Sequence, residues 1–249
     1  MIRKDTSELQ FLTDQVYCSC HFAIVTLSKQ FVYWKRMKIP RVVVSIGGSA
    51  LLRRGQPMTV ESQQECARKC AQSLAKLATE FHVVALTHGN GPQMGQLALE
   101  RQAPLDVLVA ETQGQIGHRL MSALEGVGFR ATTVVTQVLI SRDDPALEDP
   151  AKLLGPAYNE VQGKIVGHEN HGWSIRADGK HYRRAVPSPA PLAIYQLDAI
   201  KHLSLQKWPH VVIACGGGGI PVAWEDGVGL VGVEATIDKV ETVRYISSP

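Results

Sequence analysis

Three short runs of β-branched and other apolar residues along the chain each lead into glycine. They are residues 42–46 before Gly47-Gly48, residues 83–87 before His88-Gly89-Asn90-Gly91, and residues 211–215 before Gly216 through Gly219. A short apolar run bounded by glycine is typical of a parallel strand buried on both faces. Ligands bind beyond the carboxyl ends of such strands, where glycine lets backbone N–H groups approach an anion. The pattern predicts a phosphate-binding crest built from several loops.

Helical patterns separate these runs. Residues 61–80 place Cys66, Cys70, Leu74, Leu77 and Ala78 on one face, which predicts an amphipathic helix with both cysteines in the core. Further helices are predicted from Gly91-Pro92 through Leu99, over 107–126 and over 190–204, with another strand over 131–138. The alternation of strands and helices predicts an α/β fold with right-handed crossovers.

Residues 141–189 differ from the rest of the chain because turn signals follow one another closely. They are Asp143-Asp144-Pro145, Asp149-Pro150, Gly155-Pro156, Asp178-Gly179 and Pro187-Ser188-Pro189. Long insertions of this kind in compact folds are usually functional. We expect a small protruding subdomain that covers the glycine crest as a lid.

The composition of the chain limits the classes of partner that it is expected to bind. The chain has 249 residues, 45% of them hydrophobic and 20% charged, and a net charge of +3, which argues against nucleic acid as the main partner. No run is long enough to cross a membrane, and no leader is convincing, so we expect a cytoplasmic protein. Because Met37 stands directly before the first strand, residues 1–36 are expected to be an extension outside the core.

The five cysteines do not form a disulfide framework. Cys18, Cys20, Cys66, Cys70 and Cys215 are an odd number without framework spacing, which argues against a disulfide-built secreted domain. No pair of Cys or His residues has a partner pair at metal-site spacing, so no metal ligand is predicted from the sequence.

Ten short motifs follow one another along the chain, and so many motifs in one order form a specific signature. They are residues 47–55, 87–95, 104–108, 111–117, 136–138, 143–145, 152–156, 182–189, 216–222 and 232–239. Through them the chain resembles carbamate kinases, of the amino acid kinase superfamily, from Arg41 to Lys239. The resemblance implies a three-layer α/β sandwich around a mostly parallel sheet, with a protruding lid subdomain that matches 141–189. It also implies a homodimer that transfers a phosphoryl group between ATP and carbamate, giving ADP and carbamoyl phosphate, usually in the direction of ATP, with Mg²⁺.

The resemblance assigns roles to individual residues. The first glycine turn would hold the transferring phosphoryl group, and Ser49 stands where the family usually has asparagine. The second turn would face the carbamate or the same group, and two lysines would stabilise charge. The glycines after residue 215 and an aspartate would bind nucleotide. In this order the sets are Gly47, Gly48 and Ser49; Gly89, Asn90 and Gly91; Lys152 and Lys239; Gly216, Gly217, Gly218 and Asp238.

The chain departs from the family after Lys239. Val240 stands where the family has an aspartate that organises the catalytic lysines, and residues 240–249 form a divergent tail to the domain at 37–239. The family continues with most of a nucleotide-binding lobe, so we expect a C-terminally truncated fold with little or no kinase activity.

Three other interpretations stay open or are disfavoured. The chain could be an inactive remnant that serves as a binding or dimerisation module, or it could be another amino acid kinase. The motifs at Tyr182-Arg183-Arg184 and 216–222 favour the carbamate branch over the second of these. A dinucleotide-binding oxidoreductase is disfavoured because the first turn lacks the G-x-G-x-x-G pattern.

Overall fold

The computed structural model describes residues 22–26, 40–53, 56–101, 103–169, 173–207 and 209–247. Its largest sheet has five strands. Their order is β1 (Phe22–Thr26), β2 (Arg41–Ile46), β3 (His82–His88), β10 (His210–Ile213) and β4 (Arg130–Thr133). The strands from β2 to β4 are all parallel, and β1 joins the edge antiparallel to β2. Within the predicted extension at 1–36, residues 22–26 therefore add a strand to this sheet.

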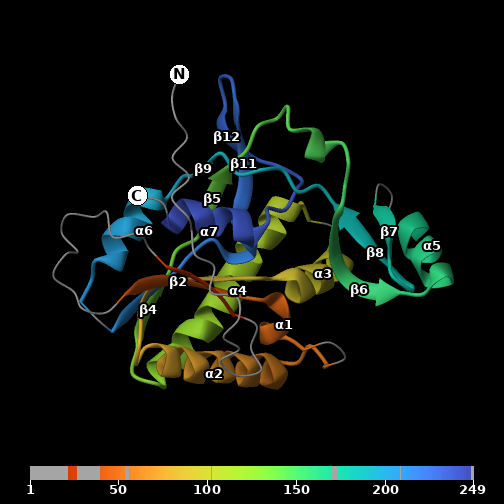
Figure 1. Cartoon of the computed structure of the whole chain (residues 1–249). Coiled ribbons are helices and arrows are strands. Elements are labelled where there is room, and N and C mark those ends of the chain that lie inside the picture. Colours follow the sequence, from red (N-terminus) through yellow and green to blue (C-terminus); the bar gives the residue numbers. More distant parts are fainter. Residues whose placement is uncertain are drawn as a thin grey trace.

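Helices cover both faces of this sheet, which gives three layers (Figure 1). On one face α2 (Val60–Leu77) and α4 (Leu105–Glu125) pack against Val42, Val44 and Ile46. On the other face α6 (Leu197–Ser204) and α7 (Lys239–Ser247) share a core with Val43. The alternation along β2 sends successive side chains to opposite layers. The predicted α/β sandwich around a mostly parallel sheet is confirmed.

The first crossover helix shows how the sequence sets an element. Thr59 caps α2 by accepting a hydrogen bond from the amide of Ser62 at 3.2 Å. Cys66 and Cys70 are 3% and 0% exposed and are free thiols, as the helical face predicted. Cys18 and Cys20 lie outside the described residues.

A second sheet continues the molecule beyond the carboxyl ends of the first. Its order is β12 (Gly229–Gly232), β11 (Ile220–Glu225), β5 (Gln137–Leu139) and β9 (Ala193–Ile194). The prediction of one strand over 131–138 is wrong, because the chain bends between β4 and β5 and enters both sheets. The prediction of a helix over 190–204 is wrong in its first part, where β9 pairs with β5 and the helix begins only at Leu197.

The turn-rich segment forms a third sheet at one end of the molecule. It contains β6 (Lys152–Tyr158), β8 (His181–Val186) and β7 (Ser174–Asp178), all antiparallel, with α5 (Glu160–Glu169) packed on them. The short helix η2 (Pro145–Leu147) precedes β6. Figure 1 shows this subdomain projecting beyond α3 (Gly91–Glu100), as predicted.

The residues after Lys239 fold as α7. Val243 is 2% exposed, and the Thr242 hydroxyl donates to the carbonyl oxygen of Gly218 at 2.7 Å. The first part of the tail predicted as divergent thus packs against the sheet. Among the described residues no helix has the length and apolar character of a membrane span.

Candidate functional site

Two glycine loops meet at the carboxyl edge of the main sheet. The first follows β2, where Gly47 precedes the short helix α1 (Gly48–Leu51). The second follows β3, where Asn90 precedes α3. A Cβ atom added to Gly89 would lie 2.7 Å from the amide nitrogen of Gly48, so the two backbones are in contact. Only glycine permits this approach.

The third glycine turn packs directly behind the second. It contains the 3₁₀ helix η3 (Gly216–Gly218), entered through Cys215 at φ 52°. A Cβ on Gly216 would lie 2.4 Å from Nε2 of His88, and one on Gly217 would lie 2.3 Å from Nδ2 of Asn90. Gly47, Gly89 and Gly216 therefore share one edge of the sheet, as the strand pattern predicted.

The glycines of the third turn are needed for packing inside the protein. Gly216, Gly217 and Gly218 are buried, and a Cβ on Gly218 would lie 2.1 Å from the carbonyl oxygen of Ile237. Gly217 and Gly218 also have positive φ, at 68° and 97°. The resemblance implies close approach of these glycines to a nucleotide, but the contacts that exclude side chains here come from the protein itself.

Buried polar side chains fix the second and third turns. The Asn90 amide donates to Oγ1 of Thr112 at 2.9 Å. Gln113 donates to the carbonyl oxygens of Thr136 and Gly216, and its own oxygen accepts the amide of Thr136 at 2.8 Å. Thr112 and Gln113 belong to the 111–117 motif, from which no role for either residue was predicted. Both residues are buried on α4, where they can support the glycine turns through hydrogen bonds.

His88 is part of this support rather than a proton carrier. Its Nδ1 donates to the carbonyl oxygen of Gly89 at 3.1 Å. Burial lowers the pKa of His88 to about 4, against a weaker opposing effect of that hydrogen bond. The ring is therefore neutral at neutral pH.

Two lysines that are far apart in sequence approach the glycine turns from different elements. Lys239, at the start of α7, donates to the carbonyl oxygen of Ile46 at 3.1 Å, directly before the first loop. Lys152, at the start of β6, donates to the carbonyl oxygen of Ile237 at 2.5 Å. The structure thus brings the lid residue and the α7 residue into one site.

The two ammonium groups lie in a partly buried, electropositive setting. Burial is the main cause that lowers the pKa of Lys152 to about 8, and Lys239 lowers it further while Asp238 opposes the shift. Burial also lowers the pKa of Lys239, again against Asp238. Binding of an anion beside the two lysines is therefore favourable, because a bound negative charge would stabilise both ammonium groups.

Asp238 and Ser49 lie at the exposed side of the site. Asp238 accepts the amide of Val240 at 2.7 Å and so caps α7. Ser49 lies in α1 with an exposed side chain, and the space beside Gly91 is open. Within the described part of the chain, no group of three His, Cys, Asp or Glu side chains could hold a metal.

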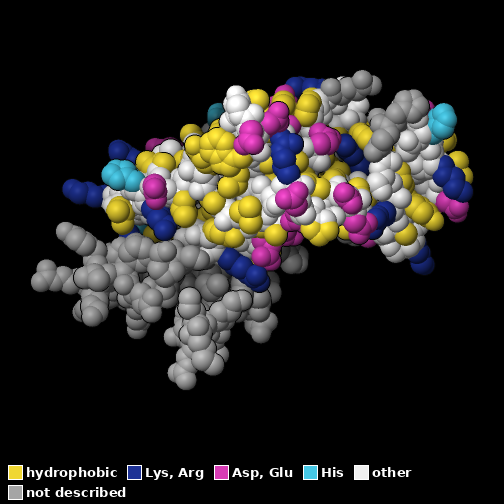
Figure 2. Space-filling model, turned by 90° about the horizontal axis from the view of Figure 1, so that it is seen from above, with side chains coloured by type: hydrophobic (Ala, Val, Ile, Leu, Met, Phe, Trp, Pro, Cys, Tyr) yellow, Lys and Arg dark blue, Asp and Glu magenta, His cyan; other side chains and the backbone are white. Residues whose placement is uncertain are grey.

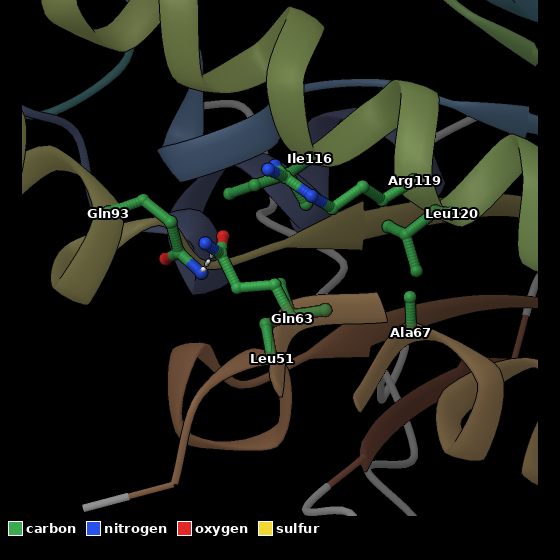
Figure 3. Close-up of a pocket in the computed structure, with 7 residues that line it drawn as sticks. All are labelled: Leu51, Gln63, Ala67, Gln93, Ile116, Arg119 and Leu120. Carbon is green, nitrogen blue, oxygen red and sulfur yellow. Dashed lines mark hydrogen bonds between the residues drawn. The ribbon is translucent and has the colours of Figure 1, made fainter. Parts of the chain in front are cut away.

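A small pocket lies elsewhere, among α1, α2, α3 and α4 (Figure 3). The amides of Gln63 and Gln93 approach each other at 3.5 Å there, beside Arg119 and the apolar side chains of Leu51 and Leu120. None of the glycines or lysines of the candidate site lines it. The candidate site is the surface formed by the loops and the two lysines.

Comparison with known proteins supports one family. The chain is 43% identical over 211 residues to the carbamate kinase of Rhizobium meliloti, which covers 80% of this chain and 64% of that protein. It is 44% identical over 207 residues to the carbamate kinase of Escherichia coli, covering 67% of it, and 42% identical to that of Thermococcus kodakarensis, covering 68%. The chain thus spans about two thirds of the length of these curated relatives. No protein-family profile matches it.

Solved structures give the same result. A carbamate kinase from Giardia lamblia bound to citric acid superposes with a TM-score of 0.75 at 32% identity. The match covers 82% of this chain and 70% of the other. A structure of the Giardia lamblia enzyme bound to AMP-PNP gives a TM-score of 0.67. The chain belongs to the carbamate kinase family.

Proposed function

We propose that the site serves phosphoryl transfer between ATP and carbamate, with carbamoyl phosphate and ADP as the other pair of reactants. The observation that carries the proposal is that Lys239 binds the carbonyl oxygen of Ile46, directly before the Gly47-Gly48 loop, while Lys152 binds Ile237 and lies within electrostatic range of Lys239. Phosphoryl transfer needs in-line positioning and neutralisation of charge on the equatorial oxygens, and little covalent chemistry from the protein. Two ammonium groups near partly exposed loop backbone supply those two requirements.

The roles follow from the positions of the groups. Backbone N–H groups of the two loops would hold the transferring phosphoryl group, since glycine loops before helices favour anions. Lys239 lies next to the first loop and would neutralise that group, and Lys152 would close over it from β6. Carbamate needs no proton removed, which agrees with a buried His88 whose pKa of about 4 makes it a weak base.

The nucleotide would lie on the side of Asp238 and the third turn. Support comes from the family, one member of which has been solved with AMP-PNP. Because Gly216, Gly217 and Gly218 are buried against protein atoms, we assign them to the support of this region and leave direct contact to Asp238.

The described residues contain no cluster of His, Cys, Asp or Glu side chains that could bind Mg²⁺ on its own. Asp238 is the carboxylate that acts on both lysines, and one of its oxygens already caps α7. Mg²⁺ is commonly held by substrate phosphates with one or two carboxylates, so here it would come with the nucleotide. None of the roles above depends on the ion.

The family further leads us to propose a cytoplasmic homodimer. The assembly can be tested by sedimentation velocity across a hundredfold range of protein concentration. A monomer at every concentration would contradict it.

The activity test is ATP formation from ADP and carbamoyl phosphate with Mg²⁺, compared with the Escherichia coli relative. We expect the unmodified chain to turn over far more slowly than the relative, because Val240 replaces the carboxylate that the family places beside Lys239. We expect this slow turnover to be lost in Lys239→Met. No ATP formation together with no binding of carbamoyl phosphate would contradict the proposed function. Turnover as fast as that of the relative would contradict the expected effect of Val240.

A further inference from the structure

The strand that carries Lys152 is irregular three residues further on. In the ladder with β8, Leu154 pairs with Arg184 and Tyr158 pairs with Tyr182, so β6 advances four residues while β8 advances two. The extra length forms a bulge that begins at Gly155, whose φ is 73°. A β-bulge redirects the strand that contains it.

The Arg183 side chain holds this bulge. Arg183 of β8 donates from Nε and Nη2 to the carbonyl oxygen of Gly155, at 3.1 and 2.7 Å. Its remaining nitrogen, Nη1, lies 3.5 Å from Asp178 at the far end of the subdomain sheet. The Arg183 side chain is 22% exposed, and the fork geometry of the guanidinium fixes the carbonyl in two directions.

The bulge is also the place where the subdomain touches the helix of the second glycine loop. A Cβ on Gly95 of α3 would lie 2.1 Å from the Cα of Gly155, so helix and strand meet backbone to backbone. Figure 1 shows β6 passing beside α3 before it enters the subdomain. Gly95 is one turn from Gly91, where α3 leaves the loop.

These contacts connect the loop to the lysine through a short rigid path. The path runs from Gly91 along one turn of α3 to Gly95, across to Gly155, and back along β6 to Lys152. We infer that Arg183, by clamping the bulge at Gly155 against Gly95, is a positioning residue that holds Lys152 against the carbonyl oxygen of Ile237. The inference rests on the proposed function of Lys152, but it concerns the place of that side chain and can be tested without turnover.

Loss of the clamp should release Lys152 toward solvent. In the intact protein the Lys152 ammonium is desolvated and bonded to the carbonyl of Ile237. When β6 is free to shift, the ammonium gains water and titrates at higher pH. Arg183 is not one of the charges that shift Lys152, so the clamp acts through geometry.

The experiment follows the ¹³Cε signal of Lys152 in ¹³C-lysine-labelled protein across pH 6–12, with the signal assigned by its absence in Lys152→Met. We expect Arg183→Ala to raise the titration midpoint from about 8 by about one pH unit or more. Arg183→Lys should do the same, because lysine keeps the charge but cannot donate the paired hydrogen bonds. Arg176→Ala is the matched control, since Arg176 pairs with Asp149 in the same subdomain and does not touch Gly155.

Three results would overturn the inference. They are an unchanged midpoint in folded Arg183→Ala, a midpoint restored in Arg183→Lys, which would assign the effect to charge, and an equal shift in Arg176→Ala. Circular dichroism establishes that each variant is folded before it is titrated. Absence of both ATP formation and carbamoyl phosphate binding in the unmodified chain would count against the proposed function and would leave this measurement unaffected.

Discussion

Burial of the Lys152 ammonium group in the candidate site lowers the stability of the folded protein. Its pKa is about 8 in the folded protein and would be near 10.5 when solvated, chiefly because burial disfavours the charge. Below pH 8 both the folded and the unfolded state bind the proton, so the folded state bears the full cost of burying it. That cost is on the order of 3 kcal/mol. Between pH 8 and 10.5 the unfolded state binds more protons, so this cost disappears as pH rises.

Lys152→Met should therefore make the protein more stable at pH 7, and the gain should shrink as pH rises from 8 to 10.5. The gain will be smaller than the full cost because the hydrogen bond to Ile237 is lost. Urea unfolding at several pH values measures it, with Lys207→Met at an exposed position as the control. A destabilised Lys152→Met protein at pH 7 would show that the buried ammonium is compensated elsewhere.

At the scale of elements, the contact between the two glycine loops should be sensitive to one methyl group. Gly89→Ala places a Cβ 2.7 Å from the backbone of Gly48, so one loop must move, and we expect a loss of about 1–3 kcal/mol, as in overpacked cores. Gly91→Ala is the matched control, because nothing lies within 4 Å of its Cβ. Equal free energies of unfolding for the two variants would contradict the loop contact.

The elements that the sequence predicted correctly are those with a local signal. The strands at β2, β3 and β10 follow from apolar runs that end in glycine, and the helix α2 follows from its apolar face. The division of 131–138 into β4 and β5 was missed because the run has no glycine or proline. Gln113 of α4 stabilises the bend, because its side chain binds both the N–H and the carbonyl oxygen of Thr136. Periodicity contains no information on such tertiary contacts.

The convergence of Lys152 and Lys239 likewise could not be derived from spacing. The two residues are on β6 and α7, and only the resemblance to a family placed them together. The joint at Gly95, Gly155 and Arg183 had no sequence signal beyond the motifs that contain it. Its reason is a backbone contact between elements that are far apart in the chain.

At the scale of the whole molecule, the subdomain and the main body should differ in protease sensitivity. The segment 141–189 projects from the body and has few buried side chains, whereas β2 and β3 are buried almost throughout (Figure 1). Limited proteolysis should cut first within this segment, away from the clamped bulge at Gly155. Mass spectrometry of the first fragments identifies the sites. Early cleavage in the sheet, with this segment intact, would contradict a protruding lid.

Hydrophobic side chains gather on the face seen in Figure 2, which is the top of Figure 1, and the second sheet contributes exposed apolar residues to the surface. Trp224 and Val228 of the β11–β12 hairpin are 58% and 67% exposed, and Tyr195 beside β9 is 57% exposed. Isolated apolar residues on a surface are ordinary, but several on one face favour contact with other protein. This face is therefore the first to examine when the assembly is measured.

The central claim is that the glycine loops and the two lysines bind the phosphoryl group of carbamoyl phosphate, and calorimetric titration with that compound tests it most directly. We expect saturable binding that weakens at least about tenfold, or about 1.4 kcal/mol, in Lys239→Met, because a partly buried ammonium next to the first loop is removed. Lys164→Met, which removes an exposed ammonium on α5, should bind like the unmodified chain. Equal affinity in Lys239→Met and the unmodified protein would contradict the account.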